Sequence, residues 1–205
     1  MLSVSVPTPE LVVVACSEFD SENNLAEGAL EELFKQYPSN TNINHVLLKV
    51  VAVNTLYRTN IYAVERVAEH IFRNVPNLDQ ALQSGDVEIV EKISKIRVGI
   101  AEREVNFFSF ASKFCSWHFQ SYFPIYDARV ERYLWNLHKQ HPFSDALHHR
   151  EDLWSYPKFF QIVSDFRTHF GLEGFSFKQI DKFLYAYGAP NTPEDANGTL
   201  PVSGN

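Results

Sequence analysis

The chain has 205 residues, with 18 Lys and Arg against 25 Asp and Glu and a formal net charge of −7. This acidic balance argues against broad, non-specific nucleic-acid binding, which usually accompanies an excess of basic residues. The apolar fraction of 45% and the aromatic fraction of 14% argue against a disordered chain and predict a packed core.

The first third of the chain predicts helices in succession. Thr8 is a candidate N-cap and Pro9 suits the first helical position, although the valines that follow would also suit a strand. A second helix is expected over 24–38 and should stop before its final proline. The segment 42–58 is apolar nearly all round, which is typical of a buried central helix.

Helical patterns continue to residue 188. Gly171 is a natural C-terminal cap for the helix before it, and Ser176 with Gln179 has the spacing of a capping box. We find no strand-like alternation bounded by hairpin dipeptides. The remaining helices are predicted over 59–74, 78–86, 86–96, 104–117, 128–140, 156–171 and 176–188.

These elements predict an all-α fold of about nine or ten helices. Residues 1–189 are expected to form a single helical domain. Residues 190–205 are rich in Pro, Gly, Asn and Ser and predict a flexible tail.

The cysteines and the hydropathy predict the compartment. Cys16 and Cys115 are too few for a disulfide framework. No stretch approaches the roughly 20 apolar residues that span a bilayer, and "LVVVAC" lacks the basic region of a secretory signal. We therefore expect a cytoplasmic protein that is not bound to a membrane.

The run "FPIYDARV", residues 123–130, places Asp127 between a loop and a helical segment. Such an Asp is an ordinary N-cap, which contributes about 1 kcal/mol, or it is the carboxylate of an active site. The run resembles the Pro-Ile-x-Asp-x-x-Val motif of the helix-hairpin-helix DNA glycosylases, in which the Asp is catalytic. Ser109, 18 residues before Asp127, and Ala111 stand where adenine-specific members have Ser-x-Ala.

Two further segments carry the resemblance, which covers roughly residues 43–135. "LYRTNI" at 56–61 is similar to the family's wedge segment, and "SKFCSWH" at 112–118 is similar to the 8-oxoguanine-glycosylase-like branch. The resemblance implies a bundle of two intertwined helical lobes with a cleft between them. It also implies base-excision repair, in which the N-glycosidic bond of a damaged base in duplex DNA is hydrolysed without a cofactor or metal.

Two features depart from the family. Its hairpin carries Leu-Pro-Gly-x-Gly, whose backbone N–H groups hold a DNA phosphate, whereas "REVNFF" at 103–108 has no glycine and the hairpin is degenerate. Lyase-type members place a Lys where Ser109 stands, and here Lys113 follows one turn later on the same helical face.

The resemblance assigns the chemistry to Asp127 and Lys113. A carboxylate near the sugar would stabilise the positive charge that develops as the base leaves, or activate water. A Lys113 amine that loses its proton through burial would attack C1′, form a Schiff base and give AP lyase activity. A charged Lys113 would leave simple hydrolysis.

The damaged nucleotide must leave the duplex, and a protein side chain must fill the gap. Tyr57 and Arg58, with Asn60 in the same segment, stand where the family places this wedge. Ser109 is a candidate DNA or substrate contact, and Trp117 and His118 are candidates for stacking on the extruded base.

Other interpretations remain open. The chain would instead be a glycosylase-derived helical scaffold that binds nucleic acid or protein without chemistry, which the acidic charge and the missing glycines favour. A histidine-rich metallohydrolase is a third hypothesis. The C-x-x-H spacing of Cys115 and His118 is a weak metal signal, because a structural zinc site needs four ligands. The histidines and carboxylates of 138–152 more simply form a polar loop that titrates near neutral pH.

Overall fold

The computed structural model describes residues 4–98 and 103–188 of the chain. The regular secondary structure of its described part is helical apart from one two-stranded sheet, so the predicted all-α class is confirmed. The predicted tail, 190–205, lies outside the described residues. The elements are α1 (Pro9–Gln36), α2 (Ile43–Tyr57), α3 (Val64–Asn74), α4 (Leu78–Ser84), α5 (Glu88–Ser94), β1 (Lys95–Val98), β2 (Arg103–Asn106), α6 (Phe108–His118), α7 (Ala128–Gln140), η1 (Arg150–Trp154), α8 (Tyr156–His169) and α9 (Phe177–Tyr187).

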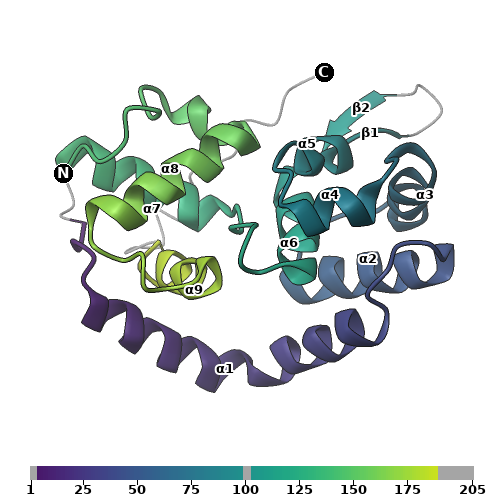
Figure 1. Cartoon of the computed structure of the whole chain (residues 1–205), viewed down its shortest axis with the longest axis horizontal. Coiled ribbons are helices and arrows are strands. Elements are labelled where there is room, and N and C mark those ends of the chain that lie inside the picture. The colour runs from purple at the N-terminus through teal and green to yellow at the C-terminus, as the bar shows by residue number, and fades with distance from the viewer. Residues whose placement is uncertain (1–3, 99–102, 189–205) are drawn as a thin grey trace.

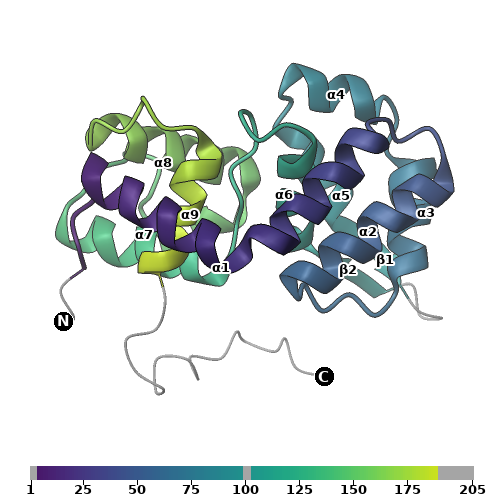
Figure 2. The ribbon, with the colours of Figure 1, turned by 90° about the horizontal axis from the view of Figure 1, so that it is seen from below.

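The helices form two groups that α1 joins. The first lobe contains α2–α6 and the sheet, and the second lobe contains α7–α9 (Figure 1). Seen from below, α1 runs across both lobes, and it packs against α9 at one end and against α2 and α6 at the other (Figure 2). The chain passes from the first lobe to the second through residues 119–127, which connect α6 to α7. This connection therefore lies between the lobes, where the resemblance to the glycosylases predicts a cleft.

The long α1 corrects the prediction of two separate N-terminal helices. Residues 20–24 are all polar, so the helical spacing of apolar residues is interrupted there. No proline interrupts the helix after Pro9, and its two ends are held by different lobes. Tertiary packing therefore carries the helix through a segment with no packing signal of its own.

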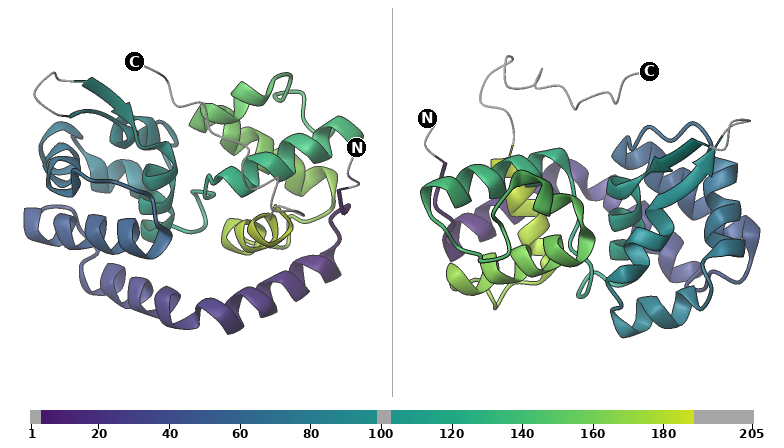
Figure 3. Two further views of the ribbon diagram at one scale, coloured as in Figure 1. Left: turned by 180° about the vertical axis from the view of Figure 1, so that it is seen from behind. Right: turned by 90° about the horizontal axis from the view of Figure 1, so that it is seen from above.

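The sheet corrects the prediction of a helix over 104–117. Residues 103–106 form β2, which pairs antiparallel with β1, and α6 begins only at Phe108. Ile96 lies opposite Val105 in the register and is buried. The sheet lies at the edge of the first lobe (Figure 3). Four residues per strand are too few for the alternating pattern to stand out in the sequence.

The expectation that the segment 42–58 is buried all round is also wrong. Leu48 and Val51 are exposed on α2, while Lys49 between them is fully buried. The Lys49 amine donates hydrogen bonds to the carbonyl oxygens of Tyr37 and Ser39 and to the side chain of Asn40. A buried cation with three acceptors fixes the turn between α1 and α2.

Several local predictions are confirmed. α7 has the predicted bounds, the Thr8 side chain accepts a hydrogen bond from the backbone of α1, and Ser176 and Gln179 form a capping box at α9. Gly171 has a positive φ of 65° just after α8. None of the described helices combines the length and apolar composition needed to cross a membrane.

Candidate active site

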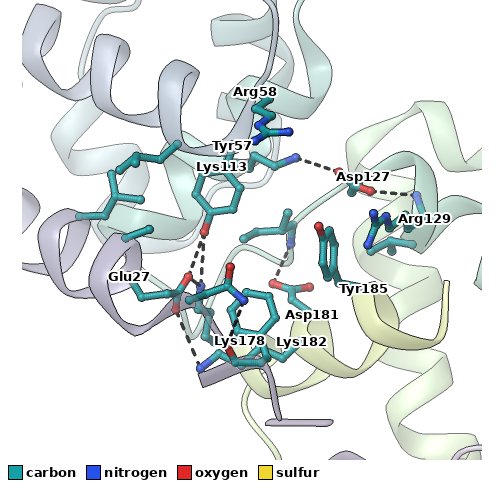
Figure 4. Close-up of a pocket in the computed structure, with 17 residues that line it drawn as sticks. Glu27, Tyr57, Arg58, Lys113, Asp127, Arg129, Lys178, Asp181, Lys182 and Tyr185 are labelled. Carbon is teal, nitrogen blue, oxygen red and sulfur yellow. Dashed lines mark hydrogen bonds and ion pairs between the residues drawn. The ribbon is translucent and has the colours of Figure 1, made fainter. Parts of the chain in front are cut away.

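A cavity of about 450 Å³ opens where the two lobes and α1 meet. Figure 4 shows charged and aromatic side chains that converge on it from α1, α2, α6, α7 and α9. Five basic side chains and three carboxylates line it, a local basic excess in an acidic chain. The charged residues of the lining are Glu27, Arg58, Lys113, Asp127, Arg129, Lys178, Asp181 and Lys182.

Asp127 is the N-cap of α7 and also a wall of this cavity. Its Oδ1 accepts the backbone N–H of Arg129 at 2.8 Å, while its Oδ2 lies 3.5 Å from Nζ of Lys113. The side chain is 27% exposed, so solvent or a ligand can reach it. Oδ1 caps the helix and Oδ2 faces the amine. The two roles considered for this residue, helix cap and active-site carboxylate, therefore belong to different oxygen atoms.

Lys113 brings a buried amine to the same place. Nζ donates hydrogen bonds to Oγ of Ser109 at 2.7 Å and to the carbonyl oxygen of Tyr126 at 3.1 Å, and it lies over the ring of Tyr57. Burial lowers the pKa of Lys113, and the charge of Asp127 opposes that shift. Of its three acceptors only Asp127 lines the cavity. A proton that passes to Asp127 therefore leaves from the side of the amine that faces this carboxylate, and the neutral amine would be a nucleophile at the cavity wall.

Tyr57 is packed into the wall by a polar network. Its hydroxyl donates a hydrogen bond to Glu27 at 3.2 Å and accepts one from Nε1 of Trp117 at 3.1 Å. Lys178 forms an ion pair with Glu27 at 2.7 Å and lies over the ring of Trp117. Burial and the charge of Glu27 raise the pKa of the Tyr57 phenol well above its usual value. These contacts hold both rings in place in the resting protein.

Arg58 stands at the rim of the cavity on a rigid turn. It is exposed, has a left-handed φ of 51°, and forms no ion pair with any described residue. The Asn54 side chain fixes the turn by hydrogen bonds to Thr59 and to the backbone of Ile61. Asn60, also exposed with a positive φ, does not line the cavity. Of the predicted wedge residues that line the cavity, Tyr57 is held in a hydrogen-bond network and Arg58 is the exposed one.

His118 faces a different part of the molecule. Its Nε2 lies 3.3 Å from the Asn40 side chain and 3.4 Å from Nζ of Lys49, and its ring packs against Phe34 and Phe114. Burial and the charge of Lys49 lower the pKa of His118 well below its usual value. Trp117 and His118 line a second hollow, and neither lines the cavity of Asp127. The structure thus brings Tyr57, Arg58 and Ser109 together with the Asp127–Lys113 pair. Trp117 and His118 lie outside the lining of that cavity.

The sequence analysis missed the contribution of α9. Asp181 is 5% exposed, its Oδ2 accepts the backbone N–H of Ile125 at 2.9 Å, and its Oδ1 has no hydrogen-bond partner among the described residues. Burial raises the pKa of Asp181 to about 8. Tyr185 lies one turn later with the Arg129 guanidinium 4.3 Å from its ring centre. Lys178, Asp181, Lys182 and Tyr185 recur at helical spacing, and that polar stripe was the available signal.

Metal ligation finds no support in the described residues 4–98 and 103–188. No group of three or more His, Cys, Asp or Glu side chains there could hold a metal ion. Cys115 is fully buried, and burial raises the pKa of its thiol. In the histidine-rich segment, Asp152 accepts the backbone N–H groups of His148 and His149. That carboxylate therefore organises a turn.

Comparison with known proteins identifies relatives. Residues 12–122, which include α2–α6 and Lys113, match the family model HI_0787_N, described as an N-terminal domain. A protein of Haemophilus influenzae (strain KW20 / Rd), described as "Uncharacterized protein", is 37% identical to the chain over 157 residues, 77% of this chain and 73% of the relative. No solved structure matches the chain.

Proposed function

The chain belongs to the HI_0787_N family, and we propose that it is a DNA glycosylase of base-excision repair, with Asp127 and Lys113 as its catalytic pair. The observation that carries the proposal is the 3.5 Å separation between the buried Lys113 amine and the Asp127 carboxylate at a shared cavity. The family's description and the relative's name state no activity, so the proposal stands on this geometry and on the glycosylase-like motif around Asp127.

The size and charge of the cavity support this chemistry. Its volume of about 450 Å³ lies within the range of ligand pockets, roughly 300–1,000 Å³. The basic excess of its lining suits a nucleotide, whose phosphates are anionic. An acidic lining would instead have favoured a scaffold that binds no nucleic acid here.

The reaction would begin with proton transfer from Lys113 to Asp127. The neutral amine then attacks C1′ of the sugar while the bond between C1′ and the base nitrogen breaks, and the base departs with that electron pair and takes the proton that Asp127 received. The nitrogen, now bonded to C1′ with two protons and a positive charge, loses one proton to the Asp127 carboxylate. Its lone pair then forms the C1′=N bond as the C1′–O4′ bond breaks, O4′ takes the proton from Asp127, and a protonated Schiff base results. Because Asp127 lies beside the attacking amine and gives its proton to the base as the base departs, its regained negative charge stabilises the positive charge that develops on the sugar.

The extruded base would lie against α9. Below a pH of about 8 the buried Asp181 retains its proton, so its unpartnered carboxyl oxygen can donate or accept a hydrogen bond at the edge of a base. Tyr185 offers an aromatic face beside it. Arg58, at the rim, would enter the gap that the base leaves in the duplex.

A lesion panel tests the proposal. Labelled duplexes that each carry one damaged base, 8-oxoguanine first, are incubated with the protein, treated with alkali and resolved by size. Wild-type protein should produce a cleaved strand on at least one lesion, and Asp127→Asn should not. Recovery of intact strands across the panel with wild-type protein would refute the proposal.

A further inference from the structure

A separate hollow with a basic lining lies in the first lobe between α3 and β1. The proposed chemistry does not use it. It encloses about 460 Å³ and is lined by Arg66, Glu69, His70, Arg73, Asn74, Lys95, Ile96, Arg97 and Glu104. We call it the α3–β1 groove. The basic residues outnumber the carboxylates by four to two, again against the charge of the whole chain.

The helix supplies one side of the groove. Arg66 and Arg73 are separated by two turns of α3, and both are exposed, while Val67 and Ile71 face the core. His70 lies between them, and its Nε2 contacts the carbonyl oxygen of Lys92 at 2.8 Å. That contact ties α3 to the end of α5 and fixes this wall of the groove.

The strand supplies the other side. Lys95 and Arg97 are exposed at alternate positions of β1, so both lie on one face of the strand. Lys95 pairs with Glu91 at 2.8 Å. Arg97 stands opposite Glu104 in the register but forms no ion pair with a described residue, and the same holds for Arg66 and Arg73. Three guanidinium groups are thus available to an external anion.

We infer that the α3–β1 groove binds the phosphate backbone of duplex DNA beside the site of excision, an inference that rests on the proposed function. Arg66 and Arg73 are about 10 Å apart along the helix axis, from a rise of about 1.5 Å per residue. Successive phosphates of one strand are spaced about 3.4 Å along the duplex axis, so with α3 aligned to the duplex the two residues would span about three phosphate intervals.

Chain continuity connects the groove with the rim of the cavity. Arg58 at the cavity rim and Arg66 in the groove are joined by the single short loop that precedes α3. A duplex whose flipped nucleotide enters the cavity would therefore extend along the first lobe. There the guanidiniums replace the phosphate contact that a glycine-containing hairpin would make.

Salt dependence of DNA binding tests the inference. The double variant Arg66→Gln, Arg73→Gln is compared with Lys139→Gln, Lys158→Gln, which removes the same charge from exposed residues of the second lobe. Binding to a fluorescein-labelled undamaged duplex is followed by anisotropy across a range of NaCl concentrations. Each lost phosphate contact lowers the slope of log affinity against log salt by about 0.9, so the groove variant should lose close to two units of slope.

The control variant should keep the wild-type slope. Both proteins should keep a Tm close to that of wild type, because these side chains are exposed and the ion pair that the control loses, Lys158 with Asp152 at 2.6 Å, lies at the surface. Equal slopes for the two double variants, or no duplex binding by wild-type protein, would overturn the inference. If the salt dependence of affinity is weaker in the groove variant while wild-type protein excises no lesion, the groove binds DNA but the proposed chemistry is wrong. If wild-type protein excises a lesion at saturating concentration but the groove variant has the wild-type salt dependence, the inference about the groove is wrong and the proposed chemistry is retained.

Discussion

The two oxygens of Asp127 have different partners: Oδ1 accepts the backbone N–H of Arg129 at 2.8 Å, and Oδ2 lies 3.5 Å from Nζ of Lys113. The first contact holds the N-terminus of α7. The second places a carboxylate beside an amine whose pKa burial lowers. The helix dipole favours a negative charge at this end of α7, so capping and catalysis make the same demand on the residue.

Substitutions at Asp127 separate its two roles. Asn caps helices as well as Asp, so Asp127→Asn should keep the Tm while excision falls about 10²–10³-fold through loss of the charge. Asp127→Ala should lose excision and also about 1 kcal/mol of stability. Thermal unfolding and single-turnover excision measure the two effects. An Asp127→Asn variant with wild-type excision would remove the carboxylate from the mechanism.

Lys113 should make the chemistry depend on pH. Only the neutral amine attacks C1′, so the single-turnover rate should rise with pH through the pKa of Lys113 and level off above it. Because burial lowers that pKa, the plateau should begin below the ordinary lysine value of about 10.4. Lys113→Arg should form no Schiff base at any pH, since its guanidinium stays charged. A wild-type rate that is flat or falls over this range would contradict the assignment.

Asp181 should make the free energy of unfolding decrease as the pH rises. Its folded pKa of about 8 exceeds the unfolded value of about 3.9, so between these values the folded state holds a proton that the unfolded state has lost. Its stabilising effect is present below the unfolded value and is lost as the pH rises toward 8, by up to about 1.4 kcal/mol per pH unit.

The isosteric Asp181→Asn removes this titration while keeping an acceptor for the N–H of Ile125. Urea unfolding between pH 5 and 8, an interval inside the window set by about 3.9 and about 8, should show wild-type stability falling relative to the variant. Parallel pH profiles would show that Asp181 ionises normally.

The Tyr57 hydroxyl should matter for stability. Tyr57→Phe leaves the Trp117 indole N–H without its acceptor, which should cost about 1–3 kcal/mol and change the tryptophan emission. Tyr185→Phe is the matched control, because that exposed phenol makes no hydrogen bond with a described residue, and its effect should stay within about 0.5 kcal/mol. Equal losses in both variants would argue against the Glu27–Tyr57–Trp117 network.

Some of this site could be predicted from local sequence. The Asp127 cap, the bounds of α7 and the contact between Lys113 and Ser109 depend on residues within one or two helical turns. Asp181 depends on packing against Ile125, 56 residues away in the chain, and no local pattern shows which face of α9 meets a cavity. The glycosylase assignment stays a prediction.

Gly188 illustrates a second limit of local reasoning. It follows α9 and looks like an ordinary helix-ending glycine in the sequence. In the fold, a Cβ at this position would collide with the carbonyl oxygen of Arg129, two residues after Asp127. The residue therefore allows α9 to approach the start of α7, a constraint that only the tertiary structure reveals.

Borohydride trapping tests the central claim most directly. Wild-type protein and Lys113→Met are incubated with a duplex that carries 8-oxoguanine or an abasic site, reduced, and analysed by denaturing electrophoresis and peptide mass mapping. The account predicts a covalent protein–DNA adduct attached at Lys113 in the wild-type protein and none in the variant. No adduct with wild-type protein, or an adduct that maps to another lysine, would contradict it.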